Sequence, residues 1–235
     1  MTINKDMLGN KQLPPLHQSG MEDAYEEAIK VTREQLAKLN IEEQCHKGGA
    51  QYLEMDSQKT IVIKYLSQPY EVSLPNFEIS LIDSKEKVHV RDKILILRYL
   101  VQAKGSPPAN RLITMKELPD GRNYSRTFSQ RAIKPVLDHF GNEPNQLIDV
   151  ATKLGGYKVE YGDAAVTINA FSRVPITIAL WHGDEEFAPT GSIMFDASIS
   201  DYLSCYDITV LCETIAWRLV KYLREAKKFA PRLKG

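Results

Sequence analysis

The side chains best suited to chemistry lie close together in the segment Trp181–Phe187, which reads WHGDEEF. One imidazole and three carboxylates within five residues are ligands for a hard or borderline metal ion, and they are also groups for general acid–base catalysis. Neighbouring residues of a strand point to opposite faces, so these groups converge only at a sharp turn, which Gly183 permits. Two further aspartates adjoin neighbouring strands, where we expect them to reach the same sheet edge. The metal ligands that this pattern predicts are His182, Asp184, Glu185, Glu186, Asp163 and Asp196.

These carboxylates also have a purely structural explanation. Aspartate and glutamate side chains accept hydrogen bonds from backbone N–H groups in turns and at helix starts, and they pair with arginine and lysine elsewhere in a fold. A metal at the Asp184-Glu185-Glu186 region would favour a metal-dependent hydrolase or lyase. The sequence leaves both explanations open.

Charge is balanced overall but segregated along the chain. The protein has 235 residues, of which 30 are Lys or Arg and 30 are Asp or Glu. Residues 174–217 contain seven acidic residues and no Lys or Arg, whereas residues 87–134 contain eleven basic and three acidic residues. Either the two segments face and neutralise one another, or the basic segment binds an anionic ligand and the acidic one a cation.

Three arginines stand near the start of an expected helix within the basic segment. Arg122, Arg126 and Arg131 accompany Tyr124 and Phe128 there, and guanidinium groups beside a helix start suit a phosphate or a carboxylate. No GxxxxGK[ST] or GxGxxG motif is present, so a nucleotide is not supported. We expect these arginines, together with Trp181 and with His182 as an axial ligand, to bind a cofactor.

The three cysteines limit the other chemistries. Cys45, Cys205 and Cys212 are odd in number and show no CxxC spacing, which argues against a disulfide framework and against a zinc or iron–sulfur site. Cys212 falls on the apolar face of a helix and predicts core packing. Cys205 lies beside that helix's start, where the alternative is a reactive thiol with a lowered pKa. This usage is typical of a reducing cytoplasm.

The hydrophobic pattern predicts an α+β fold, a largely antiparallel sheet with helices packed on it. Three short runs between residues 61 and 82 read as a meander, and VPITIALW, residues 174–181, reads as a central strand buried on both faces. Arg91, Arg98 and Gln102 share one face of a mostly buried helix over 90–103, although a strand for ILIL is the alternative. The expected helices span residues 21–39, 90–103, 128–140, 144–155 and 206–224. The expected organisation is a disordered leader over 1–20, one domain over 21–225 and a basic tail over 226–235.

Several classes of protein are excluded by composition. No apolar run approaches the roughly 20 residues of a membrane-spanning helix, and the polar N-terminus does not resemble a signal peptide. Zero net charge argues against a general nucleic-acid binder, because phosphate contacts require a basic excess. We therefore expect a cytoplasmic protein that binds neither membranes nor nucleic acids.

The segment RVPITIALWHGDEEFAPTGSIMFDASISDYL resembles the signature of an uncharacterised family, a domain of unknown function found mainly in anaerobic bacteria and archaea. The matching residues are Pro175, Trp181, Asp184, Glu185, Glu186, Phe187, Phe195, Asp196, Tyr202 and Leu203. The resemblance spans roughly residues 22–224. Some relatives carry an additional four-cysteine iron–sulfur domain, of which these 235 residues, with three cysteines, show no motif, and relatives occur in organisms with corrinoid-dependent metabolism.

Three functions from different classes follow from the residues and the resemblance. The first is a non-catalytic cofactor-binding or accessory protein of anaerobic metabolism, whose ligand is a corrinoid, haem or other tetrapyrrole. The second is a protein-interaction or assembly module whose charged faces dock a partner. The third is the metal-dependent hydrolase or lyase, with a divalent metal as its cofactor.

Overall fold

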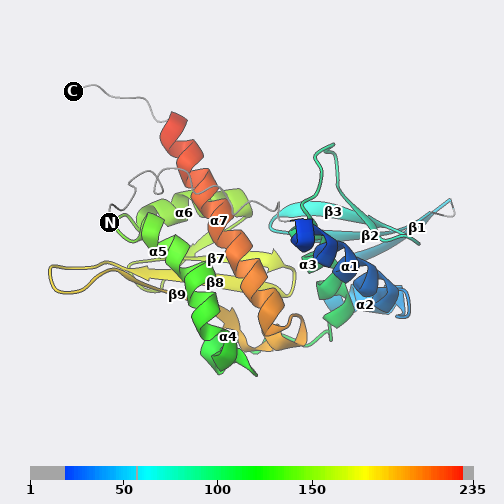
Figure 1. Ribbon diagram of the computed structural model, residues 1–235, viewed down its shortest axis with the longest axis horizontal. Helices are drawn as coiled ribbons and strands as arrows, with labels where there is room; N and C mark the ends of the chain where they lie inside the picture. Colours follow the sequence, from blue (N-terminus) through cyan, green and yellow to red (C-terminus); the bar gives the residue numbers. More distant parts are fainter. Residues whose placement is uncertain (1–18, 57, 230–235) are drawn as a thin grey trace.

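A computed structural model describes residues 19–56 and 58–229. The first half of the chain forms a four-stranded antiparallel sheet flanked by helices, in the strand order β1-β2-β3-β4 (Figure 1). The strands are β1 (Gln51–Met55), β2 (Gln58–Tyr65), β3 (Gln68–Ser73) and β4 (Glu78–Leu81). The helices are α1 (Ser19–Leu36), α2 (Ile41–Gly48) and α3 (Val90–Gln102). Along β2 every second residue is buried, namely Ile61, Ile63 and Tyr65, so one face of this sheet packs on the core.

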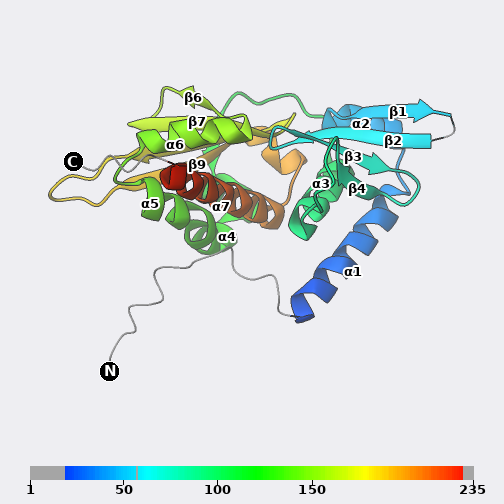
Figure 2. The ribbon, with the colours of Figure 1, turned by 90° about the horizontal axis from the view of Figure 1, so that it is seen from above.

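The second half forms a five-stranded antiparallel sheet in the order β5-β9-β8-β7-β6. Its strands are β5 (Leu112–Thr114), β6 (Tyr157–Val159), β7 (Ala164–Phe171), β8 (Val174–Trp181) and β9 (Thr190–Asp196). Its helices are α4 (Gly121–Phe128), α5 (Lys134–Phe140), α6 (Asn145–Ala151) and α7 (Cys205–Phe229). A π-helical turn, η3 (Ser129–Ile133), lies between α4 and α5. The short 3-10 turns include η2 (Met115–Glu117), η4 (Thr152–Leu154) and η5 (Ala197–Asp201). Helices α4, α5 and α7 lie on one face of this sheet (Figure 2). The central position of β8 confirms the prediction from VPITIALW.

A stack of aromatic rings joins the two halves into one continuous core. Tyr99 of α3 stacks on Phe171 of β7 with ring centroids 4.0 Å apart. Tyr65 of β2 lies 4.9 Å from Phe171, and Tyr202, which follows η5, lies 5.8 Å from Tyr99. All four residues are fully buried, and such pairs add about 0.5–1.5 kcal/mol each beyond the area they bury.

Three ion pairs join α3 to α7 and form what we call the α3–α7 seam. Arg98 lies 2.6 Å from Asp207, Arg91 lies 3.4 Å from Glu213, and Arg218 lies 2.5 Å from Asp92. The three carboxylates are almost completely buried, with relative exposures of 2–5%. A buried carboxylate without a partner is strongly destabilising, so each of these acids depends on its arginine.

Contacts between the two segments, in the seam and beside it, explain part of the charge segregation. Four of the seven acids in residues 174–217 contact the basic segment 87–134. Asp207 and Glu213 make the seam contacts, and Glu213 also pairs with Arg131. Asp201 pairs with Lys104 at 2.8 Å, and Asp196 accepts a hydrogen bond from the Ala109 N–H at 2.9 Å. The prediction that the two segments face and neutralise one another is confirmed for Asp201, Asp207 and Glu213, which pair with Lys or Arg, whereas Asp196 faces the basic segment through a backbone N–H.

The expected elements differ from the structure in a few places. The expected single sheet is two sheets, and β1 and α2 were not expected, because neither carries a periodic apolar pattern. The run ILIL is helical, as part of α3. Residues 1–18 of the expected leader and 230–235 of the expected tail lie outside the described residues. Among the described helices, none combines the length and apolarity required to cross a membrane.

Replacing Asp207 by Ala tests the seam. Asp207 accepts hydrogen bonds from Arg98 at 2.6 Å, from Gln102 at 3.1 Å and from the Ser204 hydroxyl at 2.6 Å. Asp207→Ala leaves these donors without an acceptor, so we expect the free energy of unfolding in urea to fall by about 2–4 kcal/mol. The matched control is Asp138→Ala, which removes an exposed pair with Lys134 inside α5 and changes stability by less than about 1 kcal/mol. Equal losses in the two variants would contradict the seam.

The start of α3 generates a second prediction. The His89 Nδ1 atom accepts a hydrogen bond from the Arg91 N–H at 3.3 Å. Partial burial lowers the pKa of His89. The negative charge of Asp92 opposes this shift, and the positive charges of Arg91 and Arg218 add to it. Because the unfolded chain then binds a proton more readily than the folded one, stability falls as pH drops below about 6.5. We expect His89→Asn, which keeps a capping side chain but does not titrate, to flatten the decline between pH 7 and pH 5.5 in urea denaturation. His182→Gln serves as the control and should keep the decline of the parent protein.

Candidate functional site

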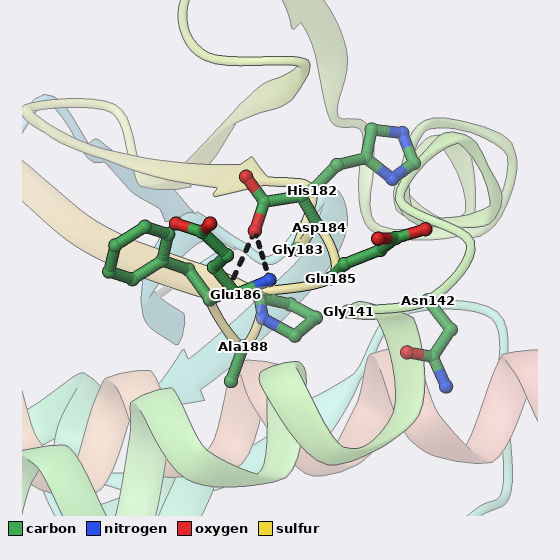
Figure 3. Close-up of a pocket in the computed structure, with 10 residues that line it drawn as sticks. Gly141, Asn142, His182, Gly183, Asp184, Glu185, Glu186 and Ala188 are labelled. Atoms are coloured by element: carbon green, nitrogen blue, oxygen red, sulfur yellow. Dashed lines mark hydrogen bonds between the residues drawn. The ribbon is translucent and has the colours of Figure 1, made fainter.

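The segment predicted to bind a metal forms the turn between β8 and β9 (Figure 3). The Asp184 N–H donates to the Phe187 carbonyl at 2.9 Å and closes this turn. Gly183 suits it because an added Cβ would lie 2.6 Å from the same carbonyl oxygen. Together with Gly141 and Asn142, which follow α5, the turn lines an open and polar cavity of about 330 Å³.

Two of the predicted carboxylate ligands are occupied by backbone hydrogen bonds. Asp184 Oδ1 accepts from the N–H groups of Glu186 at 2.9 Å and Phe187 at 2.7 Å, so this carboxylate holds the turn in shape. Asp163 Oδ2 accepts from the His182 N–H at 2.7 Å and ties the β6–β7 connection to the end of β8. Asp163 therefore does reach this sheet edge, but in a structural contact.

The other side chains of the turn spread apart. Glu185 and Glu186 leave the turn in opposite directions, and the His182 ring lies on the side of Glu185 (Figure 3). All three side chains are exposed. The turn thus presents its acidic groups to solvent singly and does not gather them around one point.

Asp196 lies at the other end of the sheet, so the expectation that it reaches the same edge was wrong. Strand β9 runs antiparallel to β8, with Thr190 opposite Trp181, so the last residue of β9 lies far from the β8–β9 turn. Asp196 Oδ1 instead accepts from the Ala109 N–H and from both the N–H and the hydroxyl of Ser198. Burial opposes ionisation of Asp196, but these hydrogen bonds outweigh it and lower its pKa.

The geometry gathers no metal site from these residues. Within the part of the chain that the structure describes, no three His, Cys, Asp or Glu side chains lie close enough together to hold a metal ion. The predicted ligands divide between the two ends of the sheet, and those at the turn are used in backbone contacts or point apart.

The residues predicted to bind a cofactor also separate. Trp181 packs edge-to-face on Tyr161 and does not line the cavity of His182. The Arg131 guanidinium donates to Glu213 of α7 at 2.5 Å. Arg122 and Arg126 are exposed residues of α4. Helix α4, the turn η3 and helix α5 follow one another directly, and His182 shares a cavity with Gly141, which follows the far end of α5.

Arg126 lines a second cavity, of about 530 Å³, bounded by α4, η3, β5 and β9. Its floor is apolar and includes Met115, Phe128 and Ile193, each at most 3% exposed. Arg126 and Lys116 stand at its rim, and neither has an ion-pair partner among the described residues. We call this space the Arg126 cavity.

The wall of the Arg126 cavity contains the π-helical turn η3. A π-turn has more than four residues per turn, so it keeps Phe128, Ala132 and Val136 in one buried row, with exposures of 2%, 0% and 1%. Ser129 and Gln130 of this turn line the cavity. Such turns are rare in helices and occur frequently at functional sites. The sequence carries no signal for this turn, so Gln130 was not expected as a site residue, and neither was Lys116 of η2, which the fold brings to the same cavity.

The cysteines do not form a reactive site. Cys45 and Cys212 are buried, and Cys212 packs in the core as predicted. The Cys205 thiol lies 3.0 Å from the Pro119 carbonyl oxygen. Burial first, and then the charge of Asp120, raise the pKa of the Cys205 thiol, so the alternative of a lowered pKa was wrong.

Comparisons with known proteins place the chain in a family without assigning it an activity. No curated protein and no solved structure matches the chain. A family model with the description "Domain of unknown function (DUF3786)" matches residues 40–218, which is most of the chain and includes both sheets. The chain belongs to this DUF3786 family of uncharacterised domains.

Proposed function

We propose that the protein is a non-catalytic binding protein for a small organic anion, held in the Arg126 cavity. The observation that carries this proposal is the pair of unpartnered cations, Arg126 and Lys116, at the rim of a cavity with an apolar floor. The half-buried arginines Arg91, Arg98, Arg131 and Arg218 each contact a carboxylate, whereas Arg126 and Lys116 are exposed and have no ion-pair partner among the described residues.

The rim suits a carboxylate, sulfonate or phosphate. A guanidinium presents parallel N–H donors that match two oxygens of such a group, and charge-assisted bonds of this kind are about twice as strong as neutral ones. Ser129 and Gln130 add a hydroxyl and an amide beside Arg126. An anionic head group is thus offered both charge and hydrogen bonds.

The floor suits an apolar body attached to that head group. Ligand cavities of about 300–1,000 Å³ are typically lined by apolar side chains with a few polar groups that fix orientation. The Arg126 cavity, at about 530 Å³, has this composition, with Phe128, Ile133 and Ile193 below the polar rim. Its lining includes no His, Cys, Asp or Glu that could act as a general base beside its serines, which favours binding over catalysis.

A tetrapyrrole ligated by His182 and held by three arginines does not fit this arrangement. The cavity of His182 is polar and has no arginine in its lining, and Arg131 is bound to Glu213. Haem and cobalamin are therefore tested below as ligands of the Arg126 cavity, with no role for His182.

The test uses the fluorescent probe 8-anilinonaphthalene-1-sulfonate, which joins one anionic group to an apolar body. We expect Arg126→Gln to weaken its binding about tenfold or more, because one charge-assisted contact is worth about 1.5–3 kcal/mol and 1.4 kcal/mol is tenfold. The matched control is Arg122→Gln, one helical turn earlier and outside the cavity lining, which should bind as the parent does. The uncharged analogue N-phenyl-1-naphthylamine should be insensitive to both changes.

A cavity-filling variant separates this cavity from other apolar surfaces. Ser129 is exposed and lines the cavity, so Ser129→Trp should keep the fold, judged by circular dichroism, and abolish binding of both probes. Haem and cobalamin are then titrated into the parent and the same variants by absorbance. Probe binding that survives both Arg126→Gln and Ser129→Trp would overturn the proposal.

A further inference from the structure

A third cavity opens where the two halves of the protein meet. It measures about 490 Å³ and is bounded by β3, β4, the segment before α3, the start of α3, and α7. We call it the junction cleft. The lining residues on which the argument rests are Lys87, Arg91, Asp92, Arg218 and Lys221.

The floor of the junction cleft is a buried ion pair. Asp92 of α3 is 4% exposed and lies 2.5 Å from Arg218 of α7. The Tyr65 hydroxyl donates to the other oxygen of Asp92 at 3.0 Å. Burial, followed by the charge of Asp92, raises the pKa of Tyr65, so this hydroxyl keeps its proton and remains a donor. The Asp92 carboxylate is thereby fully engaged.

The arginines of the cleft have more donors than their partners use. A guanidinium carries five N–H donors, and Arg218 directs one terminal nitrogen to Asp92 and also interacts with the Tyr70 hydroxyl, while its Cζ atom lies 5.6 Å from the centre of the Tyr65 ring. Arg91 contacts Glu213 through one terminal nitrogen at 3.4 Å, and its Nε atom has no hydrogen-bond partner. Both side chains line the cleft.

Two lysines at the rim have no comparable structural contact. Lys87 has no ion-pair partner among the described residues, and Lys221 lies 3.9 Å from Glu225 in an exposed pair of little strength. The lining as a whole contains four basic residues against the two acids Glu86 and Asp92. A concave surface with such an excess concentrates positive potential.

We propose that the junction cleft is a second binding site, which takes a compact polyanion, that is, a phosphate ester or a polycarboxylate. The seam accounts for Asp92, Arg91 and Arg218, but it does not account for Lys87 and Lys221 converging on the same cavity from the α3 approach and from α7. A ligand with several negative groups contacts both lysines at the rim and the spare donors of Arg218 inside. This proposal is independent of the Arg126 cavity, which shares no lining residue with the cleft.

Such a ligand bridges the two halves and stabilises the folded protein. Its contacts come from α3 and its approach on one side and from α7 on the other. A ligand that binds only the folded state at about 100 times its Kd raises Tm by about 5 °C or more for a chain of this length. The effect weakens with added salt, because the rim charges are exposed.

The probes are inorganic pyrophosphate and citrate, titrated by thermal shift and by isothermal calorimetry at low salt. We expect at least one of them to raise Tm, and the tighter of the two identifies phosphate or carboxylate as the preferred group. The double variant Lys87→Gln/Lys221→Gln, at exposed positions, should weaken binding about tenfold or more.

The matched control is Lys85→Gln/Lys228→Gln. These lysines occupy the same loop and the same helix, are exposed, and lie outside the cleft lining. The control should bind within about twofold of the parent, since an equal change in net charge at the wrong positions leaves the site intact. The proposal is overturned if neither anion shifts Tm, or if both double variants lose binding equally.

Discussion

The fold depends on the burial of three carboxylates, Asp92, Asp207 and Glu213, between α3 and α7. A carboxylate taken out of water is stable only when a cation and further donors surround it, so each acid requires its arginine at one position on the facing helix. Replacing a buried ion pair by apolar residues of equal volume often leaves stability unchanged, so what the seam adds is geometric: each arginine reaches its acid at one position along the facing helix. The seam therefore ties α3, which belongs to the first sheet's half, to α7, which covers the second sheet. The aromatic stack of Tyr65, Tyr99 and Phe171 joins the same two halves.

Glu213 connects this constraint to both proposed binding sites. It accepts from Arg91, which lines the junction cleft, and from Arg131, which belongs to the π-helical turn in the wall of the Arg126 cavity. One buried carboxylate thus fixes the α3 side of one cavity and the helix that bounds the other. The cations with a structural role are those with a buried acid beside them. Arg126, Lys116 and Lys87 have none among the described residues, and each of them also lines a cavity; these two features together are the physical basis for assigning them to ligands.

The β8–β9 turn shows why a dense group of acidic residues is a weak predictor of a metal site. Asp184 closes the turn by accepting two backbone N–H groups, and Asp163 secures its base in the same way. Ionised carboxylates are strong acceptors for backbone donors at a tight turn, so a Gly-Asp sequence there satisfies the backbone before it serves any ligand. The remaining acids, Glu185 and Glu186, face solvent on opposite sides (Figure 3).

The sequence by itself determined the α+β class, the buried central strand at residues 174–181, and the helical face shared by Arg91, Arg98 and Gln102. It also showed that opposite charges are segregated between two segments, but it left open whether these segments pair with one another. Each of these is a local periodicity or a composition, which the chain carries before it folds. Only the tertiary structure decided that Asp196 lies at the end of the sheet away from the β8–β9 turn, that Asp92 pairs with Arg218, 126 residues further along the chain, and that η3 is a π-turn. Antiparallel order, helix packing and the choice between α and π hydrogen bonds are set by contacts between distant segments. A single sequence therefore names the charged residues but leaves their partners to the fold.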